Sequence, residues 1–379
     1  MRSIARIPIT RKTAIEIIGD TQVLGLDDGD FTKARSMLFP RQVLAGHDVI
    51  GTVPDSCKDF GLSGTALIVT GDKTMKVAGN AVRDGLTANG YEVQIINVGE
   101  ATNDNLEKVM KAAHECKADF LLGVGGGSKI DLAKMAATNL SKEFLSIPTS
   151  ASHDGIASGR ASIRSGSGPI SHEARVPLAV IADTGIIAKS PYRLLAAGCA
   201  DVISNATALM DWEFARRLRY EEFSRSAYAL ASYTAQTIIE NADLIRPNLE
   251  ESVWIAIRPI IISGISMSVA GSSRPTSGSE HMFSHALDLI APGKALHGEQ
   301  CGVGCIMMMY LHGGDWMRIR EALTKIGAPT SAKELGVSKE QVIEALVTAH
   351  QIRKDRFTIL GMGLTREAAE RIATITRVI

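Results

Sequence analysis

The sequence predicts an α/β Rossmann-like domain built on a parallel sheet, followed by an all-helical domain. Five short apolar segments alternate with stretches of helical periodicity up to about residue 188, and amphipathic stretches of helical length fill residues 189–379. A glycine-rich turn stands between one apolar segment and the helical stretch after it. Continuous apolar strands that alternate with helices are typical of a parallel sheet covered on both faces. We therefore expect two domains, 40–188 and 189–379, with a ligand cleft between them.

The five strands are expected at residues 66–70, 92–98, 120–124, 144–147 and 177–182. Each is a short apolar run with a strand-like composition. Helices are expected to begin near Lys73, Leu106 and Ser128. Residues 1–39 are polar and weakly patterned, so we interpret them as an N-terminal extension that adds nothing to the core.

Composition excludes several classes of function. The 379 residues include 41 Lys and Arg and 41 Asp and Glu, so there is no net positive charge to attract nucleic acid or an anionic membrane. Only 5% of the residues are aromatic, which argues against a surface on which bases stack. Residues 253–270 are apolar but contain Arg258 and Pro259, so they predict a buried helix and no integral membrane segment. The five cysteines form no C-x-x-C pair and the N-terminus lacks a signal core, which favours a cytoplasmic protein.

The glycine-rich turn is GVGGGSKID at residues 123–131. Glycines there let the backbone approach a ligand, and the N-terminus of the next helix would offer free N–H groups to a pyrophosphate. The order differs from the usual G-x-G-x-x-G, and the turn follows the third expected strand, so a tight packing turn is an equally good interpretation. A second polar loop, PTSASHDGIAS at 148–158, follows the next strand and could line a cofactor groove.

Three histidines fall close together. The pattern SGSE at 277–280 is a capping box, which predicts that a helix begins there, with His281 and His285 on one face. His297 follows after a short Pro-Gly turn. Zinc commonly binds two imidazoles and a carboxylate, leaving one position open for catalysis. Asp201, a charge in a small apolar surround, and Asp288 are both candidates for the carboxylate.

These segments together resemble a known family. The order in which five motifs occur is that of the sn-glycerol-1-phosphate dehydrogenases of archaeal ether-lipid synthesis. The motifs are GGGSKID at 125–131, PTSASHDG at 148–155, GCAD at 198–201, SGSEH at 277–281 with His285, and HGE at 297–299. That family belongs to the wider group of glycerol dehydrogenases, iron-type alcohol dehydrogenases and dehydroquinate synthases. The resemblance runs from about Phe39 to the C-terminus. It implies a dehydroquinate synthase-like fold and zinc-dependent reduction of dihydroxyacetone phosphate.

The resemblance also implies roles for particular residues. Asp201, His281 and His297 would hold Zn2+, and Asp154, Asp201 and His285 would contact the substrate, with His285 as a proton relay. The nicotinamide cofactor would contact Gly127, Ser128, Lys129, Ile130, Asp131, Thr149, Ser150, Ala151, Ser152 and Ser158.

Two properties of the ligands stay open. Asp72 favours NAD because a carboxylate there would repel a 2′-phosphate, whereas Lys73 and Lys76 would soften that repulsion, so NAD and NADP are both candidates. The substrate phosphate needs donors, and Arg160, Arg274 and Lys294 are the basic residues near the motifs.

Three other functions compete with this interpretation. An NAD-linked glycerol dehydrogenase would use unphosphorylated polyols. A dehydroquinate synthase-like lyase would need a denser basic phosphate site, and a non-catalytic nucleotide-binding protein would not need the metal ligands. In every enzymatic case the partner is a small molecule, and a homo-oligomer is allowed although no residue specifies one.

Overall fold

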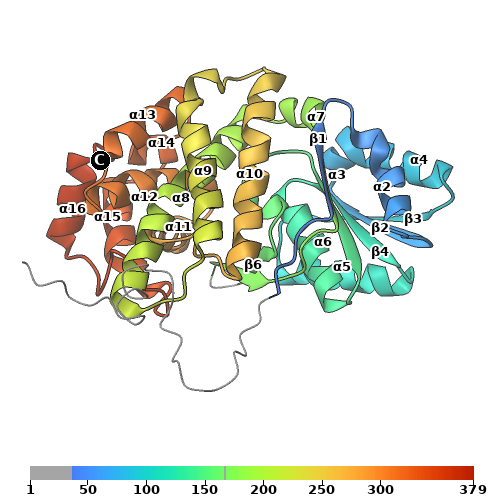
Figure 1. Cartoon of the computed structure of the whole chain (residues 1–379), viewed down its shortest axis with the longest axis horizontal. Coiled ribbons are helices and arrows are strands. Elements are labelled where there is room, and N and C mark those ends of the chain that lie inside the picture. Colours follow the sequence, from blue (N-terminus) through green and yellow to red (C-terminus); the bar gives the residue numbers. More distant parts are fainter. Residues whose placement is uncertain (1–35, 166–167) are drawn as a thin grey trace, which may run out of the picture.

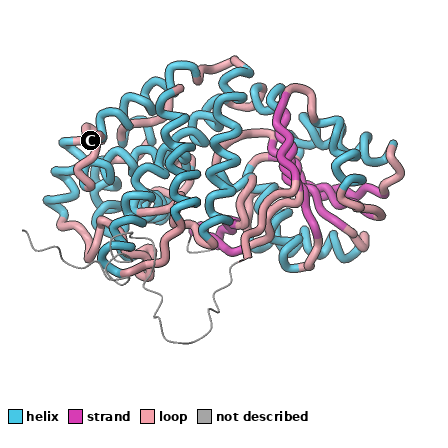
Figure 2. Tube along the Cα trace, viewed as in Figure 1, coloured by secondary structure: helices cyan, strands magenta, loops and turns pink. Residues whose placement is uncertain are grey.

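The computed structural model describes residues 36–165 and 168–379, so most of the expected N-terminal extension, residues 1–35, lies outside the described part (Figure 1). A six-stranded parallel sheet, in the order β1-β8-β5-β4-β2-β3, forms the first half. Figure 2 shows these strands gathered at one side of the molecule and helices filling the other. The predicted fold class is therefore confirmed. The strands are β1 (Gln42–Gly46), β2 (Thr65–Thr70), β3 (Glu92–Asn97), β4 (Phe120–Gly125), β5 (Glu143–Pro148), β6 (Arg160–Ser165), β7 (Gly168–Glu173) and β8 (Ala179–Asp183).

All five expected strands are present, as β2, β3, β4, β5 and β8, but three further strands were not predicted. The edge strand β1 is only five residues long and leaves Val43 exposed, so its sequence lacks the continuous apolar run of a central strand. The hairpin of β6 and β7 forms a separate antiparallel sheet, and its Arg- and Ser-rich sequence looks like a loop. These strands depend on partners rather than on their own composition.

Helices cover both faces of the parallel sheet because alternate strand residues point to opposite sides. Along β2, Ala66 and Ile68 belong to the apolar cluster that includes α2 and α4, whereas Leu67 and Val69 belong to the cluster that includes α5 and α6. The helices of this half are η1 (Ile50–Thr52), α2 (Val53–Asp59), α3 (Asp72–Thr74), η2 (Met75–Gly79), α4 (Asn80–Ala88), α5 (Asn103–Glu115), α6 (Gly127–Asn139), η3 (Asp154–Ile156) and α7 (Thr184–Ala188). The helix starts expected near Lys73, Leu106 and Ser128 are those of α3, α5 and α6.

The second half is helical. Among the described residues, one helix, α10, has the length and apolar composition to cross a membrane. However, 61% of its most apolar 18-residue stretch is buried inside the protein. It packs against α9 and α8, as the interrupting Arg258 and Pro259 led us to expect. The helices are α8 (Tyr192–Arg219), α9 (Arg225–Glu240), η4 (Ala242–Leu244), α10 (Glu250–Ala270), α11 (Ser279–Ile290), α12 (His297–Leu311), α13 (Trp316–Ile326), α14 (Ala332–Leu335), α15 (Lys339–Thr348), η5 (Ala349–Gln351) and α16 (Arg366–Ile375).

Candidate active site

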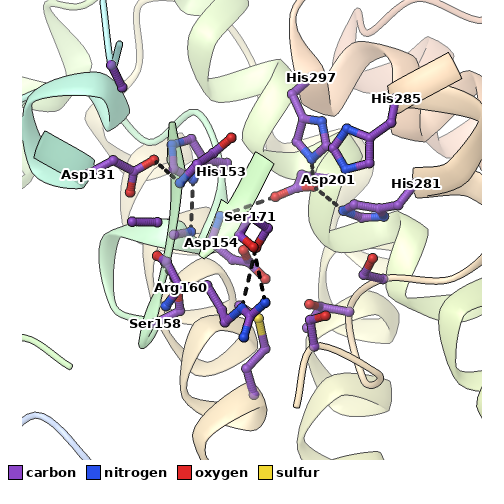
Figure 3. A pocket seen from close by; sticks show the side chains of 18 of the residues that line it. Asp131, His153, Asp154, Ser158, Arg160, Ser171, Asp201, His281, His285 and His297 are labelled. Atoms are coloured by element: carbon purple, nitrogen blue, oxygen red, sulfur yellow. Dashed lines mark hydrogen bonds and ion pairs between the residues drawn. The ribbon is translucent and has the colours of Figure 1, made fainter. Parts of the chain in front are cut away.

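A cavity of about 330 Å³ lies where the carboxyl side of the sheet meets the helical half. Residues predicted to bind the cofactor and residues predicted to bind the metal and substrate both line this cavity. Ser128 comes from the start of α6 and Asp154 from the loop after β5. The three histidines come from α11 and α12 (Figure 3). Ligand sites of open α/β sheets are generally found beyond the carboxyl ends of the strands. The residues predicted to be functional that line the cavity are Ser128, Asp131, Asp154, Ser158, Asp201, His281, His285 and His297.

Two glycines allow the segments of the site to approach one another. A Cβ atom added to Gly198 on α8 would lie 2.0 Å from the carbonyl oxygen of Ala151 in the polar loop. One added to Gly298 on α12 would lie 2.0 Å from the carbonyl oxygen of Ala197. Both positions therefore exclude any larger residue without a shift of the backbone. This packing brings Asp201, the polar loop and His297 to one place.

The carboxylate Oδ1 of Asp201 is the centre of a candidate metal group. It lies 3.7 Å from Nε2 of His281 and 3.8 Å from Nε2 of His297. Asp288 instead accepts a hydrogen bond from Gln300 at 3.1 Å and lies 3.9 Å from His285 Nδ1. Of the two candidate carboxylates, Asp201 lies near both His281 and His297, because α8 passes beside α11 and α12.

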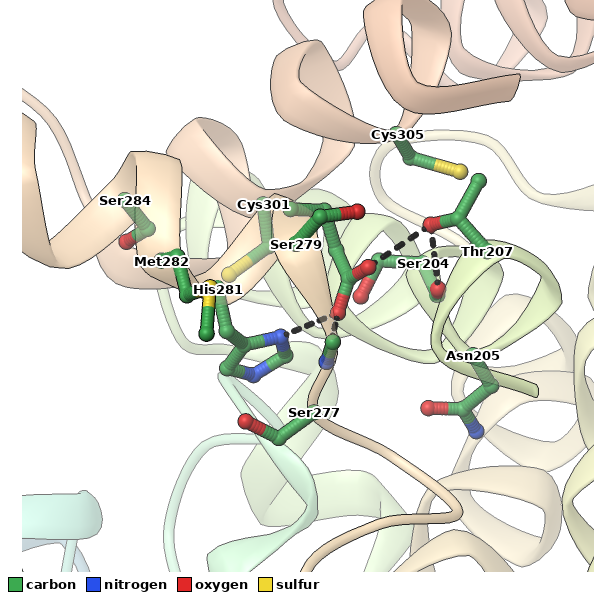
Figure 4. Close-up of polar contacts among 12 residues, drawn as sticks. Ser204, Asn205, Thr207, Ser277, Ser279, His281, Met282, Ser284, Cys301 and Cys305 are labelled. Carbon is green, nitrogen blue, oxygen red and sulfur yellow. Dashed lines mark hydrogen bonds and ion pairs between the residues drawn. The ribbon is translucent and has the colours of Figure 1, made fainter. Parts of the chain in front are cut away.

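The partners of the two histidines orient their Nε2 atoms toward Asp201. Nδ1 of His281 lies 2.9 Å from a carboxylate oxygen of the buried Glu280 (Figure 4). Nδ1 of His297 lies 3.1 Å from Ser284 Oγ, and that hydroxyl donates to Gln300 Oε1 at 2.6 Å, so it accepts from the imidazole. In His297 the proton is therefore on Nδ1, and the Nε2 atoms of both histidines lie near Asp201. Metal-binding histidines are generally oriented in this way by such partners.

The charge states also suit a cation. Burial, followed by the charges of the neighbouring histidines, lowers the pKa of His281 well below its ordinary value, and burial lowers that of His297 to about 3. Both rings are therefore neutral, which is the form that binds metal. Burial raises the pKa of Asp201 to about 7, and burial together with the charge of Asp201 raises that of Asp154 to about 7. Two buried carboxylates short of positive charge would be stabilised by a divalent ion.

Cys301 is a fourth member of the group that the sequence did not indicate. Its Sγ lies 3.6 Å from His297 Nε2, and the ligand atoms of Asp201, His281, His297 and Cys301 all lie within 4.8 Å of one another. The sequence has no C-x-x-C pair, which is the usual signal of a thiolate zinc site. The spacing of four residues between His297 and Cys301 on α12 was the available signal. Burial raises the pKa of this thiol well above its ordinary value.

His285 lies beside the group without belonging to it. Its ring is stacked on that of His297, with centroids 5.6 Å apart, and lies 6.4 Å from that of His281. Its side chain is 24% exposed and lines the cavity. Figure 3 shows His285 beside His297. This position suits a group that contacts a ligand in the cavity.

The other residues predicted to bind the cofactor lie around the start of α6 and the end of β5. The Ile130 and Ala151 side chains are fully buried in the core, so only their backbones could contact a ligand. Lys129 donates to the carbonyl oxygen of Gly99 at 2.9 Å, across the ends of the strands. Seven of the residues predicted to bind the cofactor do not line the cavity: Gly127, Lys129, Ile130, Thr149, Ser150, Ala151 and Ser152.

Lys134 is a further residue that sequence reasoning missed. This fully buried ammonium donates to the carbonyl oxygens of Gly155 and Arg160, both at 2.6 Å, and lies 3.5 Å from Asp131. Burial lowers its pKa. The contacts fasten α6 to the loop that carries Asp154, and the spacing of three residues from Asp131 was the only local signal.

His153, in the same loop, is the second residue missed. Its Nδ1 accepts a hydrogen bond from Gly155 N at 2.9 Å, and a Cβ atom added to Gly127 would lie 1.9 Å from its Nε2. The ring therefore packs on the glycine turn and lines the cavity.

The capping box expected at 277–280 is wrong in its details, although helix α11 begins at Ser279 as expected. The N-cap is Gly278, without a side-chain cap. The buried carboxylate of Asp211, on α8, accepts from Ser279 N at 2.7 Å instead. The Glu280 side chain accepts from Gly278 N at 2.5 Å and from Thr207 Oγ1 at 2.9 Å. A residue distant in sequence replaces the local cap.

The fold and the candidate metal group resemble those of the iron-containing alcohol dehydrogenases. The family model for iron-containing alcohol dehydrogenase matches residues 44–191. Glycerol dehydrogenase from Schizosaccharomyces pombe has the same fold, with a TM-score of 0.74, 19% identity, and coverage of 91% of this chain and 92% of that one. Sulfoacetaldehyde reductase from Bifidobacterium kashiwanohense, solved in complex with NAD+, matches with a TM-score of 0.71, 15% identity, and coverage of 91% and 99%.

Sequence relatives narrow the class to one family. The NAD(P)+ glycerol-1-phosphate dehydrogenase of Methanosarcina mazei is 56% identical over 346 residues, which is 91% of this chain and 97% of the relative. That of Methanothermobacter thermautotrophicus is also 56% identical over 346 residues, covering 91% and 99%. The chain belongs to the glycerol-1-phosphate dehydrogenase family. The predicted family is confirmed.

Proposed function

We propose that this protein reduces dihydroxyacetone phosphate to sn-glycerol 1-phosphate with NADH or NADPH, and so supplies the backbone of archaeal ether phospholipids. The observation that carries the proposal is one cavity that joins the N-terminus of α6 to the group of Asp201, His281 and His297. The similarity to glycerol-1-phosphate dehydrogenases supports the choice of substrate. We assign residues 40–188 to cofactor binding and 189–379 to metal and substrate binding.

Asp201, His281 and His297 would hold zinc, which supplies Lewis-acid polarisation of a ketone when bound, while the reduced nicotinamide supplies the hydride. The protein's own groups orient the reactants. The start of α6 would bind the pyrophosphate through backbone N–H groups, together with the polar loop at 149–158. Asp154, held by a 2.8 Å hydrogen bond from Ser263, would bind a substrate hydroxyl.

His285 would donate the proton that the product oxygen needs. It lines the cavity beside His297, and an imidazole is a suitable donor because its ordinary pKa lies near neutral pH. Cys301 is fully buried. We do not assign it as a fourth metal ligand, because catalysis needs the fourth metal position open for the substrate.

The test measures NADH and NADPH oxidation with dihydroxyacetone phosphate and with dihydroxyacetone, followed by chiral analysis of the product. We expect turnover of the phosphorylated ketone and formation of the sn-1 enantiomer, and Asp201→Asn serves as the inactive control. Preference for dihydroxyacetone would instead establish the glycerol dehydrogenase alternative, which has the same fold. Turnover of neither ketone would refute both.

The proposal places the reaction in the cytoplasm, with small-molecule ligands and without nucleic acid or membrane partners. Helix α10 is mostly buried, which supports the absence of an integral membrane segment. A homo-oligomer remains allowed, and light scattering on the purified protein would measure it.

A further inference from the structure

The cavity has two chemically different ends. Figure 3 shows the imidazoles grouped around Asp201 and Arg160 apart from them, beside Ser171. Arg353 and hydroxyl side chains of the loop between α10 and α11 also line the cavity. Of the three cations that the sequence offered for a phosphate, Arg160 alone lines this cavity. Arg274 is buried and pairs with Glu221 through both Nε and Nη2, and Lys294 is exposed on the turn before α12.

Arg160 is held in place without a carboxylate partner. Its Nε and Nη2 donate to Ser171 on the neighbouring strand of the hairpin, at 3.3 and 3.5 Å (Figure 3). Within residues 36–165 and 168–379, no carboxylate lies at ion-pair distance from its guanidinium. Burial, and after it the positive charge of Arg353, lowers the pKa of Arg160. The two guanidinium groups thus repel each other at one end of the cavity, where an anion would relieve the repulsion.

Arg353 comes from the segment after η5, which a neighbouring residue joins to the rest of the site. Arg356 donates to Ser273 Oγ at 2.9 Å and to the carbonyl oxygen of Ser277, which joins this segment to the loop before α11. Ser273 and Ser277 both line the cavity. Within the described part of the chain, the Arg353 guanidinium pairs with the exposed Asp355, from Nη2 at 3.3 Å and from Nε at 3.4 Å, and the Arg353 side chain is 34% exposed. It can therefore turn to a ligand at small cost.

We propose that Arg160 and Arg353 bind the phosphate group of the substrate while its ketone lies at the metal group. The assignment rests on the proposed function, since it concerns the same site. A phosphomonoester carries nearly two negative charges, and the planar guanidinium matches phosphate oxygens with paired N–H donors. The serine hydroxyls add neutral donors. This arrangement gives the protein a means to select the phosphorylated ketone over the unphosphorylated one.

The cofactor is the other source of phosphate. Its pyrophosphate would bind at the start of α6, where the helix offers N–H groups, and Ser128 of that turn also lines the cavity. A role of the two arginines in binding the cofactor would lower NADH or NADPH affinity, whereas a role in binding the substrate would leave it unchanged.

The test compares Arg160→Gln and Arg353→Gln with the control Lys354→Gln, which removes the same charge at the neighbouring exposed position. The kcat/KM values for dihydroxyacetone phosphate and for dihydroxyacetone are measured, together with NADH affinity by fluorescence titration. We expect each arginine variant to lose roughly 10- to 100-fold in kcat/KM for the phosphorylated ketone, the range for a lost hydrogen bond to a charged group. Dihydroxyacetone turnover and NADH affinity should stay within about twofold of wild type, as for the control.

Several outcomes would overturn the proposal. Equal losses for both ketones would show that the arginines act on the fold or on the reacting centre, and weaker NADH binding would assign them to the cofactor. Arg353→Lys keeps the charge but loses the paired donors, so it should fall between wild type and Arg353→Gln and guards against misfolding. If the wild type reduces neither ketone, the proposed function fails separately. In that case the phosphate site is tested by whether inorganic phosphate protects each protein against thermal unfolding. Protection that is lost in the arginine variants alone would support the site, and equal protection of all proteins would exclude it.

Discussion

Replacing Lys134 with methionine tests how far the buried ammonium organises the site. The substitution keeps a long side chain but removes the donors to the Gly155 and Arg160 carbonyl oxygens, each at 2.6 Å, and the charge 3.5 Å from Asp131. Lys134 is fully buried, so water cannot replace these contacts. Two carbonyl groups and one carboxylate lose their charged donor, although Ser158 Oγ still donates to the Arg160 carbonyl oxygen at 3.3 Å and Ser162 N to Asp131 at 3.1 Å. We therefore expect a less stable protein whose substrate loop is poorly held.

The magnitude follows from the burial. Removing one partner of a buried ion pair costs about 3–5 kcal/mol, because the other charge stays buried and unpaired. At roughly 2.1 cal/mol/K of unfolding entropy per residue, a chain of this length has an unfolding entropy of about 0.8 kcal/mol/K. The loss then lowers the melting temperature by about 4–6 °C. Removing both charges, in Asp131→Asn combined with Lys134→Met, should cost less than the single change because no buried charge is left alone.

Differential scanning calorimetry on the two variants measures this effect. Lys111→Met is the control, since Lys111 is 76% exposed and makes only a surface pair with Glu115 at 3.8 Å. Its stability should change by less than about 0.5 kcal/mol. A melting temperature for Lys134→Met equal to that of the control would refute the reasoning. So would a double variant that is less stable than Lys134→Met.

Three further predictions concern the site. His281→Ala should lose both zinc, measured by elemental analysis, and turnover, because two protein ligands hold a catalytic zinc poorly. A fully active variant with stoichiometric zinc would contradict the assignment of His281 as a metal ligand. Gly126→Val should lose NADH affinity in a titration but keep its fold and zinc, since a Cβ there meets only Ser150 Oγ, at 3.2 Å; unchanged affinity would make the turn purely structural. His285→Ala should keep zinc and NADH binding but reduce the ketone about 100-fold more slowly, the lower range for a lost general acid. Zinc loss in His285→Ala as severe as in His281→Ala would identify a ligand, and normal kinetics would assign proton transfer to solvent.

The sequence by itself determined five of the six strands of the parallel sheet, the position of the glycine turn and the start of the histidine helix. These features are local: a buried parallel strand is a continuous apolar run, as in β4, and residues four apart share a helix face, as His281 and His285 do. The resemblance to a family added the prediction that Asp201 and His297 are metal ligands. Local patterns alone did not decide between Asp201 and Asp288.

Only the tertiary structure placed Asp201, and several other groups, beside the histidines. Asp201 joins the histidines because α8 crosses beside α11 and α12, and Cys301 joins them from the second turn of α12. Arg353 reaches the cavity although 193 residues separate it from Arg160, because Arg356 binds the loop before α11. Contacts of this kind join segments far apart in the chain, and a short sequence window contains no record of its distant partners. The composition of each segment therefore predicted its secondary structure, whereas packing between segments determined which charges meet in the cavity.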